Sequence, residues 1–217
     1  MTAPPSLSFA GQLPFKYVGG DASVDFVNTV DWAVRGPIED RLTDYDRLTR
    51  WAEGASAISP RQGAELRALA AAHPRLAERV YREALNLRWQ LRRLYVAAHR
   101  GERLDGSDAL EELNGSLRSA LGQLELSSPP RGAEAKVPLR WRWHDAAERL
   151  DSVLWPVLRS AAELLASAEA AQIRECAGDD CGWMYVDRSR NGLRRWCQME
   201  TCGNREKAKR RGKAAPA

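Results

Sequence analysis

Four cysteines, all in the last fifth of the 217-residue chain, are the side chains best suited to bind a metal ion. Cys176, Cys181, Cys197 and Cys202 follow the pattern C-x4-C-x15-C-x4-C, and the first 175 residues contain no cysteine. Two short cysteine loops each supply two corners of the tetrahedron that Zn²⁺ prefers. The pattern predicts one bound zinc ion. Two disulfides or four free thiols are the alternatives, and a reducing cytosol disfavours the disulfides.

The predicted zinc is structural, because four thiolates leave no open coordination position for water or a substrate. About forty residues bury too little apolar surface to fold alone. A structural zinc contributes about 10–16 kcal/mol of apparent binding free energy, which is enough to fold such a segment. The loaded site carries net negative charge, and some of the nearby arginines would offset it.

Positive charge is concentrated in the same segment. Residues 172–217 contain 11 basic and 6 acidic side chains, a net charge of +5, whereas the whole chain has a net charge of +4. Such asymmetry is typical of a segment that binds an anionic partner, most often nucleic acid, and the alternative is a solvated tail that keeps the protein soluble. The candidate DNA-contacting residues are Arg188, Arg190, Arg194, Arg195, Arg205, Lys207, Lys209, Arg210 and Arg211. The alternative is a zinc-stabilised module that binds another protein and not DNA.

The local sequence predicts a treble-clef-like zinc module. Cys176 and Cys181-Gly182 resemble a metal-binding turn in which glycine lets backbone N–H groups face the sulfurs. A strand over 183–186, the turn signal Asn191-Gly192 and a return strand over 193–197 would form a hairpin. Asn204 would cap a final basic helix with a Glu206–Arg210 pair. A short arginine-rich helix in place of the hairpin is the alternative.

The first 171 residues are predicted to form a mainly helical domain. The clearest helix covers Ala77–Ala98, where apolar residues recur at the spacing of one buried stripe and Gly101 ends the helix. Further helices are expected over 21–30, 43–51, from Ser59-Pro60 onwards, over 107–120, and over 145–171 with a kink or restart at Pro156. The segment Arg35–Asp40 is expected to be a loop.

A change of period predicts one β-hairpin in this domain. Leu124 and Leu126, then Val137, Leu139, Trp141 and Trp143, alternate with other residues, as in half-buried strands. The turn would lie in 127–136. The expected fold class is α+β, mainly α: a helical domain with a β-hairpin over 1–171, and a small four-cysteine zinc finger over 172–217.

No catalytic constellation is evident, and the sequence predicts a protein that is not an enzyme. His73, His99 and His144 are isolated at expected element boundaries. Asp25, Asn28 and Thr29 either line a polar pocket for an unknown small molecule or satisfy helix ends. No signal peptide or membrane span is evident, so a cytoplasmic protein without a membrane partner is expected. A homodimer is compatible with a single short finger.

The tail resembles the CGNR zinc finger, through Cys202-Gly203-Asn204-Arg205, Cys181-Gly182-Trp183, 187–191 and Arg195-Trp196-Cys197. The part before it resembles the ABATE domain, through Asp25-Phe26-Val27-Asn28-Thr29 and the Leu48/Trp51 pair. The resemblance implies a bacterial, stress-related transcriptional regulator with a DNA-binding finger and an N-terminal sensor or scaffold domain.

Overall fold

The computed structural model describes residues 13–33, 36–129 and 137–213, and they form a mainly helical body with three small hairpins. The elements are α1 (Ala22–Val27), β1 (Val30–Ala33), β2 (Gly36–Asp40), α2 (Tyr45–Gly54), α3 (Pro60–Ala72), α4 (Pro74–His99), α5 (Asp108–Leu121), β3 (Leu124–Ser127), β4 (Arg140–Trp143), the 3₁₀ turn η1 (Leu150–Leu154), α6 (Trp155–Leu165), the 3₁₀ turn η2 (Ala168–Gln172), β5 (Ile173–Glu175), β6 (Met184–Val186), the π turn η3 (Met199–Gly203) and α7 (Asn204–Lys213).

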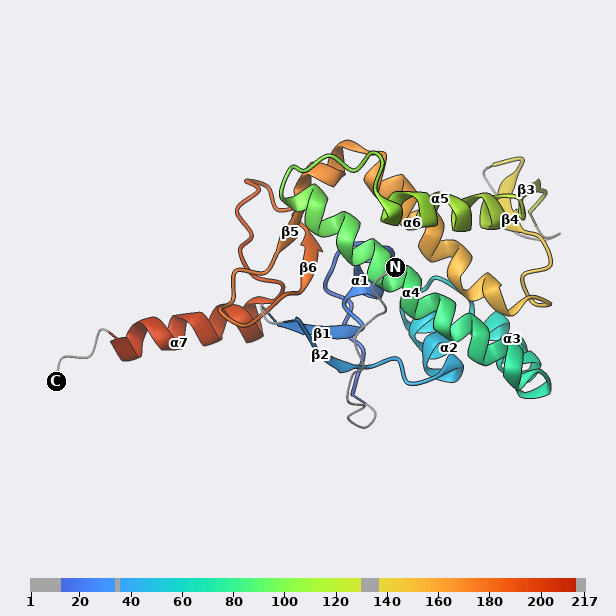
Figure 1. Ribbon diagram of the computed structural model, residues 1–217, viewed down its shortest axis with the longest axis horizontal. Coiled ribbons are helices and arrows are strands. Elements are labelled where there is room, and N and C mark those ends of the chain that lie inside the picture. Colours follow the sequence, from blue (N-terminus) through green and yellow to red (C-terminus); the bar gives the residue numbers. More distant parts are fainter. Residues whose placement is uncertain (1–12, 34–35, 130–136, 214–217) are drawn as a thin grey trace.

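The long helix α4 packs against α1, α2, α3, α5, β5 and the turns η1 and η2 (Figure 1). Pro74 occupies its first turn, where a missing N–H costs nothing, and Gly101 follows its end with a positive φ of 68°. The stripe predicted from the sequence is buried at Val80, Leu87 and Leu91. Helices α1, α2 and α3 and strand β5 all contact it. The hydrophobic core is therefore built around one helix.

Side-chain caps fix the starts of α3 and α5, at the positions where the sequence predicts these helices to begin. The side chain of Ser59 accepts a hydrogen bond from the backbone N–H of Gln62, and that of Ser107 accepts one from Leu110. The helix expected over 145–171 is α-helical only over Trp155–Leu165, with the 3₁₀ turns η1 and η2 on either side of it. Pro156 lies in the first turn of α6, directly after η1, so the helix starts at the proline as expected.

The first helix and the loop after it differ from the prediction. Helix α1 ends at Val27 and not at residue 30, because Val30 already belongs to β1. The segment expected as a loop forms β2, which pairs antiparallel with β1 around a bulge between Asp31 and Trp32. The glycine and proline of this segment favour a loop, but hydrogen bonding to the neighbouring strand β1 holds it in the extended conformation.

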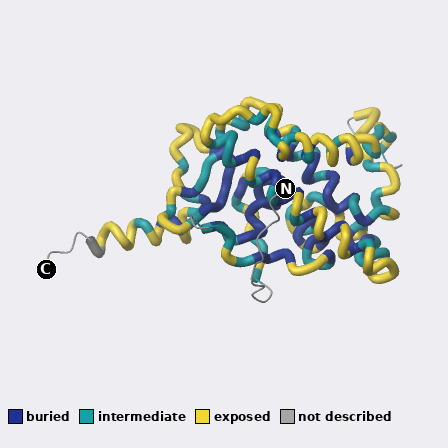
Figure 2. The backbone as a smooth tube through the Cα atoms, viewed as in Figure 1, coloured by how far each residue is buried: buried dark blue, intermediate teal, exposed yellow. Residues whose placement is uncertain are grey.

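The predicted β3–β4 hairpin is confirmed, with Leu124 opposite Trp143 and Leu126 opposite Trp141. The expected half-buried face is only partly realised, since Leu126 and Trp141 are both 55% exposed. Most of its predicted turn, residues 130–136, lies outside the described residues. The hairpin lies at one end of the body (Figures 1 and 2), where the Trp143 ring packs against the Trp155 ring of α6 with centroids 5.6 Å apart.

One continuous core joins the helices to the cysteine-rich segment. Phe26 and Trp51 pack with ring centroids 5.1 Å apart and are fully buried. Met184 and Tyr185 of β6 belong to the same buried cluster. In the part of the chain that the structure describes, no helix has the length and apolar character needed to cross a bilayer.

Candidate metal centre and basic surface

The four cysteine sulfurs meet at one point, with all four ligand atoms within 4.8 Å of one another. The Cys181 and Cys197 sulfurs are 3.8 Å apart, and those of Cys197 and Cys202 are 3.7 Å apart. Zinc–sulfur bonds of about 2.3 Å in a tetrahedron place sulfurs about 3.8 Å apart. A disulfide needs about 2.05 Å. The donor set and its spacing fit one structural zinc ion.

The β5–β6 hairpin positions the first two ligands. Cys176 follows β5 and Cys181 precedes β6, so both lie in the connecting turn. The backbone N–H of Cys181 donates to the carbonyl oxygen of Gly178 at 3.1 Å. A Cβ atom at Gly178 would lie 3.3 Å from the Cβ of Cys181 and 3.6 Å from the sulfur of Cys202. The turn therefore closes tightly around the metal site.

The third and fourth ligands come from irregular backbone and from η3. Cys197 donates its backbone N–H to the Cys176 sulfur at 3.3 Å, and Cys202 lies in η3, two residues before the start of α7. Hydrogen bonds with the Cys181 and Cys197 thiols, and from the backbone of Cys197 and Gly178, lower the pKa of Cys176. The same thiol–thiol contacts raise the pKa of Cys181 and of Cys197, so only the backbone N–H donors favour the thiolate form that binds zinc.

The predicted hairpin around Asn191-Gly192 is wrong. Strand β6 pairs with β5, which precedes it, and residues 193–197 form no strand. Asp187 organises the segment instead, because its carboxylate accepts hydrogen bonds from the backbone N–H groups of Ser189 at 2.9 Å and Arg194 at 3.0 Å. Gly192 takes a positive φ of 60° in the resulting turn. The knuckle and the final helix of the treble-clef-like layout remain.

The prediction that Gly182 lets backbone N–H groups face the sulfurs agrees with the structure, since the N–H of Trp183 hydrogen-bonds to Cys181, while the N–H of Gly182 itself donates to the carbonyl oxygen of Trp32 at 2.8 Å. Two other details of the finger differ from the prediction. Asn204 is the first residue of α7 with helical φ and ψ, and Glu206 contacts Lys209 at 3.4 Å and not Arg210.

Three of the predicted DNA-contacting residues form ion pairs or hydrogen bonds with other residues of the protein. Arg188 forms a bidentate ion pair with Glu169, at 2.9 and 2.7 Å. The Arg194 guanidinium lies 4.2 Å from the ring centroid of Tyr185 and donates to the carbonyl of Val18 at 2.9 Å. Lys209 forms an ion pair with Asp179 at 2.8 Å.

The other predicted DNA-contacting residues are exposed, and none forms an ion pair among the described residues. They are Arg190, Arg195, Arg205, Lys207, Arg210 and Arg211. Lys207, Arg210 and Arg211 are spaced i, i+3 and i+4, so they share one face of α7. The helix projects away from the body, and its surface is exposed along most of its length (Figures 1 and 2).

The residues considered for a polar pocket hold the chain together. The Asn28 side chain donates to the carbonyl of Met184 at 2.8 Å and accepts from its N–H at 3.0 Å. Asp25 accepts from the N–H of Gly19 at 2.7 Å, and burial raises the pKa of Asp25 to about 6. Thr29 accepts from Arg88 at 2.9 Å. None of the three predicted residues lines a described cavity.

A buried ion pair that the sequence did not indicate supports the same region. Arg88 of α4 and Asp40 at the end of β2 form a bidentate pair, with one N–O distance of 2.8 Å. Both side chains are almost fully buried. The sequence hints at this pair only through an arginine within an otherwise apolar stripe of the helix. It does not identify the partner of Arg88, because Asp40 lies 48 residues earlier.

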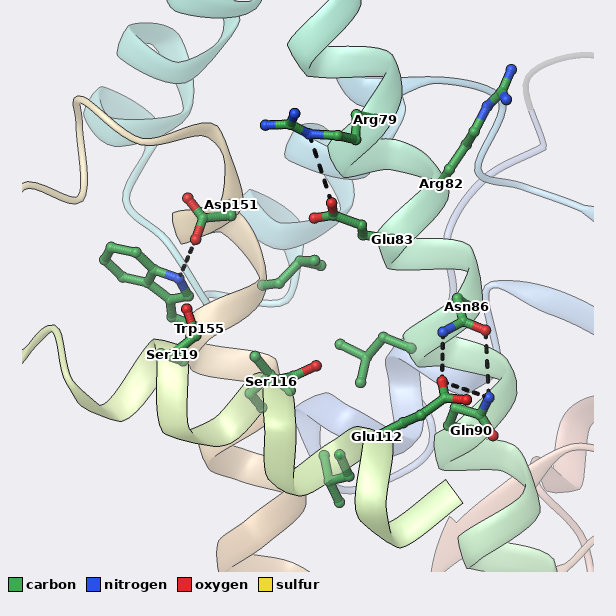
Figure 3. Close-up of a pocket in the computed structure, with 15 residues that line it drawn as sticks. Arg79, Arg82, Glu83, Asn86, Gln90, Glu112, Ser116, Ser119, Asp151 and Trp155 are labelled. Atoms are coloured by element: carbon green, nitrogen blue, oxygen red, sulfur yellow. Dashed lines mark hydrogen bonds and ion pairs between the residues drawn. The ribbon is translucent and has the colours of Figure 1, made fainter. Parts of the chain in front are cut away.

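A cavity of about 440 Å³ lies between α4, α5 and α6 (Figure 3). Its floor is apolar, and its rim is polar. The rim groups satisfy one another: the Glu112 carboxylate accepts from Asn86 at 2.8 Å and from Gln90 at 2.9 Å, and Asp151 accepts from Trp155 at 3.1 Å. No buried polar atom of this rim lacks a partner.

The fold and the site define a helical domain that carries a four-cysteine zinc finger. The ABATE family model, described as putative stress-induced transcription regulator, matches residues 20–168, and the CGNR zinc finger model matches residues 172–213. No curated protein matches the chain. The chain belongs to the ABATE family and ends in a CGNR zinc finger.

Proposed function

We propose that this protein binds duplex DNA through α7, with the zinc site as the anchor of that helix. The observation that carries the proposal is the position of α7: it starts two residues after the last zinc ligand and presents Lys207, Arg210 and Arg211 on one exposed face. A helix of this length spans about 15 Å, and the DNA major groove admits an α-helix.

The other exposed cations of the module would add phosphate contacts to those made by Lys207, Arg210 and Arg211. Arg190, Arg195 and Arg205 are exposed and belong to the same module. Phosphate contacts supply affinity and register, whereas base edges supply specificity. Arg188 and Arg194 act in the proposal as structural residues, because their guanidinium groups already bind Glu169 and the carbonyl of Val18.

The proposal describes a regulator that binds and does not catalyse. Four sulfurs fill the zinc coordination sphere, so the ion offers no position for a reacting group. DNA as the partner implies a cytoplasmic location in a bacterium. The helical part would then act as a sensor or a scaffold.

Binding of the zinc-loaded full chain to a pool of random duplex DNA, measured by fluorescence anisotropy, tests the proposal. Replacing Lys207, Arg210 and Arg211 together by alanine should weaken binding about 30-fold or more near physiological salt. The slope of log K against log salt should fall by about 2.7 for three lost phosphate contacts.

The matched control removes three exposed cations elsewhere: Arg61, Arg79 and Arg82, replaced together by alanine. It loses the same formal charge and should bind DNA with nearly wild-type affinity. Equal losses in the two triple variants would contradict a role for α7. A wild-type chain that does not bind DNA would favour the protein-interaction alternative.

A further inference from the structure

Exposed apolar side chains of the described residues gather on and beside the β3–β4 hairpin. Five of them lie in this hairpin or within three residues of it, and we call them the hairpin patch: Leu121, Leu126, Val137, Leu139 and Trp141. Their exposed fractions range from 43% to 55%. Leu126 and Trp141 are cross-strand neighbours, so their side chains form one surface. Single exposed leucines need no explanation, whereas a cluster of this kind is typical of a contact surface.

The patch is the uncovered part of an amphipathic hairpin. Side chains alternate along a strand, so Leu126 and Trp141 share a face with Leu124 and Trp143. The Trp143 end of this face packs on the Trp155 ring of α6. The opposite face is polar and carries the ion pair between Glu125 and Arg142. The apolar face therefore continues beyond the part that α6 covers, where a hairpin facing only solvent would be polar.

The Trp141 ring is held in place although it is exposed. The Arg159 guanidinium of α6 lies 5.7 Å from its centroid, and Arg159 is itself fixed by Glu163 at 2.7 Å. A large ring that is already ordered loses little conformational entropy on binding, and tryptophan is among the residues that contribute most to protein interfaces. More than half of the ring's residue surface, 55%, remains available to a partner.

The size and shape of the patch favour a protein partner. None of its five residues lines a described cavity, so the surface offers no enclosed site for a small molecule. The exposed fractions correspond to about 450 Å² of apolar surface. Two copies of the patch facing each other would bury about 900 Å². With the polar residues around it, the contact would approach about 1,200 Å², the lower limit for a stable interface.

The charges around the patch favour a second copy of this chain as that partner. Arg118 and Arg140 are exposed and have no carboxylate partner among residues 13–33, 36–129 and 137–213. Glu148 is exposed and has no cationic partner in the same ranges. A strongly acidic or strongly basic partner would match only one of these signs, whereas a second copy presents both.

We propose that the hairpin patch is the interface of a symmetric homodimer, in which Leu126, Leu139 and Trp141 of each copy pack against the same patch of the other. The patch lies at the opposite end of the molecule from α7, so both copies of α7 stay exposed in the dimer (Figure 1). The proposal does not depend on DNA binding, because no residue of the patch belongs to the zinc finger.

Sedimentation equilibrium of the zinc-loaded full chain without DNA, over about 1–200 µM protein, tests the proposal. The weight-average mass should rise with concentration from 24.2 kDa towards twice that value. The monomer mass at every concentration would overturn the proposal, and it is also the result expected if the patch binds a different protein.

Three variants locate the interface. Leu139→Asp lies outside the paired strands and places a charge in the patch, and it should raise the dimer dissociation constant about 30-fold or more. Trp141→Thr keeps a residue that favours a strand and should have a similar effect. Ile38→Asp, at a 55% exposed position of β2, is the control and should leave dimerisation unchanged.

Zinc content and circular dichroism identify a variant that fails to fold. Leu139→Asp should fold, because its side chain is exposed in the monomer. Unchanged dimerisation of folded Leu139→Asp, or an equal loss in Ile38→Asp, would show that the dimer forms through another surface and would overturn the proposal.

Discussion

The side chain of Asn28 hydrogen-bonds to the free edge of strand β6 of the zinc finger, where a neighbouring strand would otherwise pair. Its amide group donates to the carbonyl of Met184 and accepts from the N–H of the same residue, as a backbone peptide would. Strand β6 pairs with β5 on one side only, so these two groups would otherwise be buried without partners. The side chain is 1% exposed, which makes both hydrogen bonds difficult for water to replace.

We expect Asn28→Ala to lower the free energy of unfolding by about 2–4 kcal/mol, because the N–H and C=O of Met184 both lose their partner. Urea denaturation of the zinc-loaded protein, followed by circular dichroism, measures the change. Asn114→Ala is the control, since Asn114 is an exposed helical residue, and it should be neutral or slightly stabilising. Equal stability of the two variants would show that the Asn28–Met184 pairing contributes nothing.

The importance of Asn28 could be suspected from the sequence, but its role could not be predicted. Asp25, Asn28 and Thr29 stood out as polar residues in an apolar segment, and a polar pocket was one interpretation. The partner of Asn28 lies 156 residues further along the chain, beyond the reach of any local pattern. The cysteines differ in this respect, because zinc imposes its own geometry on their spacing.

At the scale of elements, the sequence predicted the helices whose positions are set by apolar periodicity and by the residues at their ends. Helix α4 follows from its apolar periodicity and from the glycine after it, and the start of α3 follows from Pro60 at its first position. The finger was predicted less well, because Asn191-Gly192 favours a two-residue hairpin turn. The carboxylate of Asp187 holds that segment in a different turn, and β5 takes the strand partner's place.

Helix α7 lacks the packing that stabilises the other helices. Its main neighbour is η3, and its described side chains are polar or small and mostly exposed. Isolated helices shorter than about 12–15 residues are marginal in water, and neighbouring cations repel one another. The zinc site fixes only the first turn. A bound polyanion would neutralise the charge and stabilise the rest.

We therefore expect the amides of residues 205–213 to exchange with solvent fast in the free protein and more slowly when duplex DNA is bound. Hydrogen–deuterium exchange with mass spectrometry measures both states. Amides around Leu91 in α4 serve as the internal control, because they lie in the core and should be protected in either state. Protection of α7 equal to that of α4 without DNA would show that the helix is stable alone.

At the scale of the whole molecule, the two family matches meet between residues 168 and 172, and the core continues across that boundary. Ile173 and Met184 are fully buried in the same cluster as Val24 and Phe26. Hydrogen bonds also cross the boundary, from Gly182 to Trp32 and from Val186 to Gly19, both at 2.8 Å. The finger therefore supplies part of the core of the helical body.

Removal of zinc should consequently destabilise the entire chain. Each kcal/mol of stability lost corresponds to about 2–4 °C in Tm for a protein of this size, and a structural zinc contributes several kcal/mol. We expect a strong chelator to lower the Tm of the cooperative transition by about 10 °C or more in differential scanning calorimetry. Added zinc should restore it.

Cys202→Ser separates loss of the metal from side effects of the chelator. This variant keeps three sulfurs and the size of the fourth side chain, and it should show the low Tm with or without chelator. If the finger were an independent unit attached by a linker, calorimetry would instead show two transitions, and the upper one would not respond to zinc. That result would contradict a shared core, because it would show that unfolding of Met184 and Tyr185 does not lower the stability of the helical part.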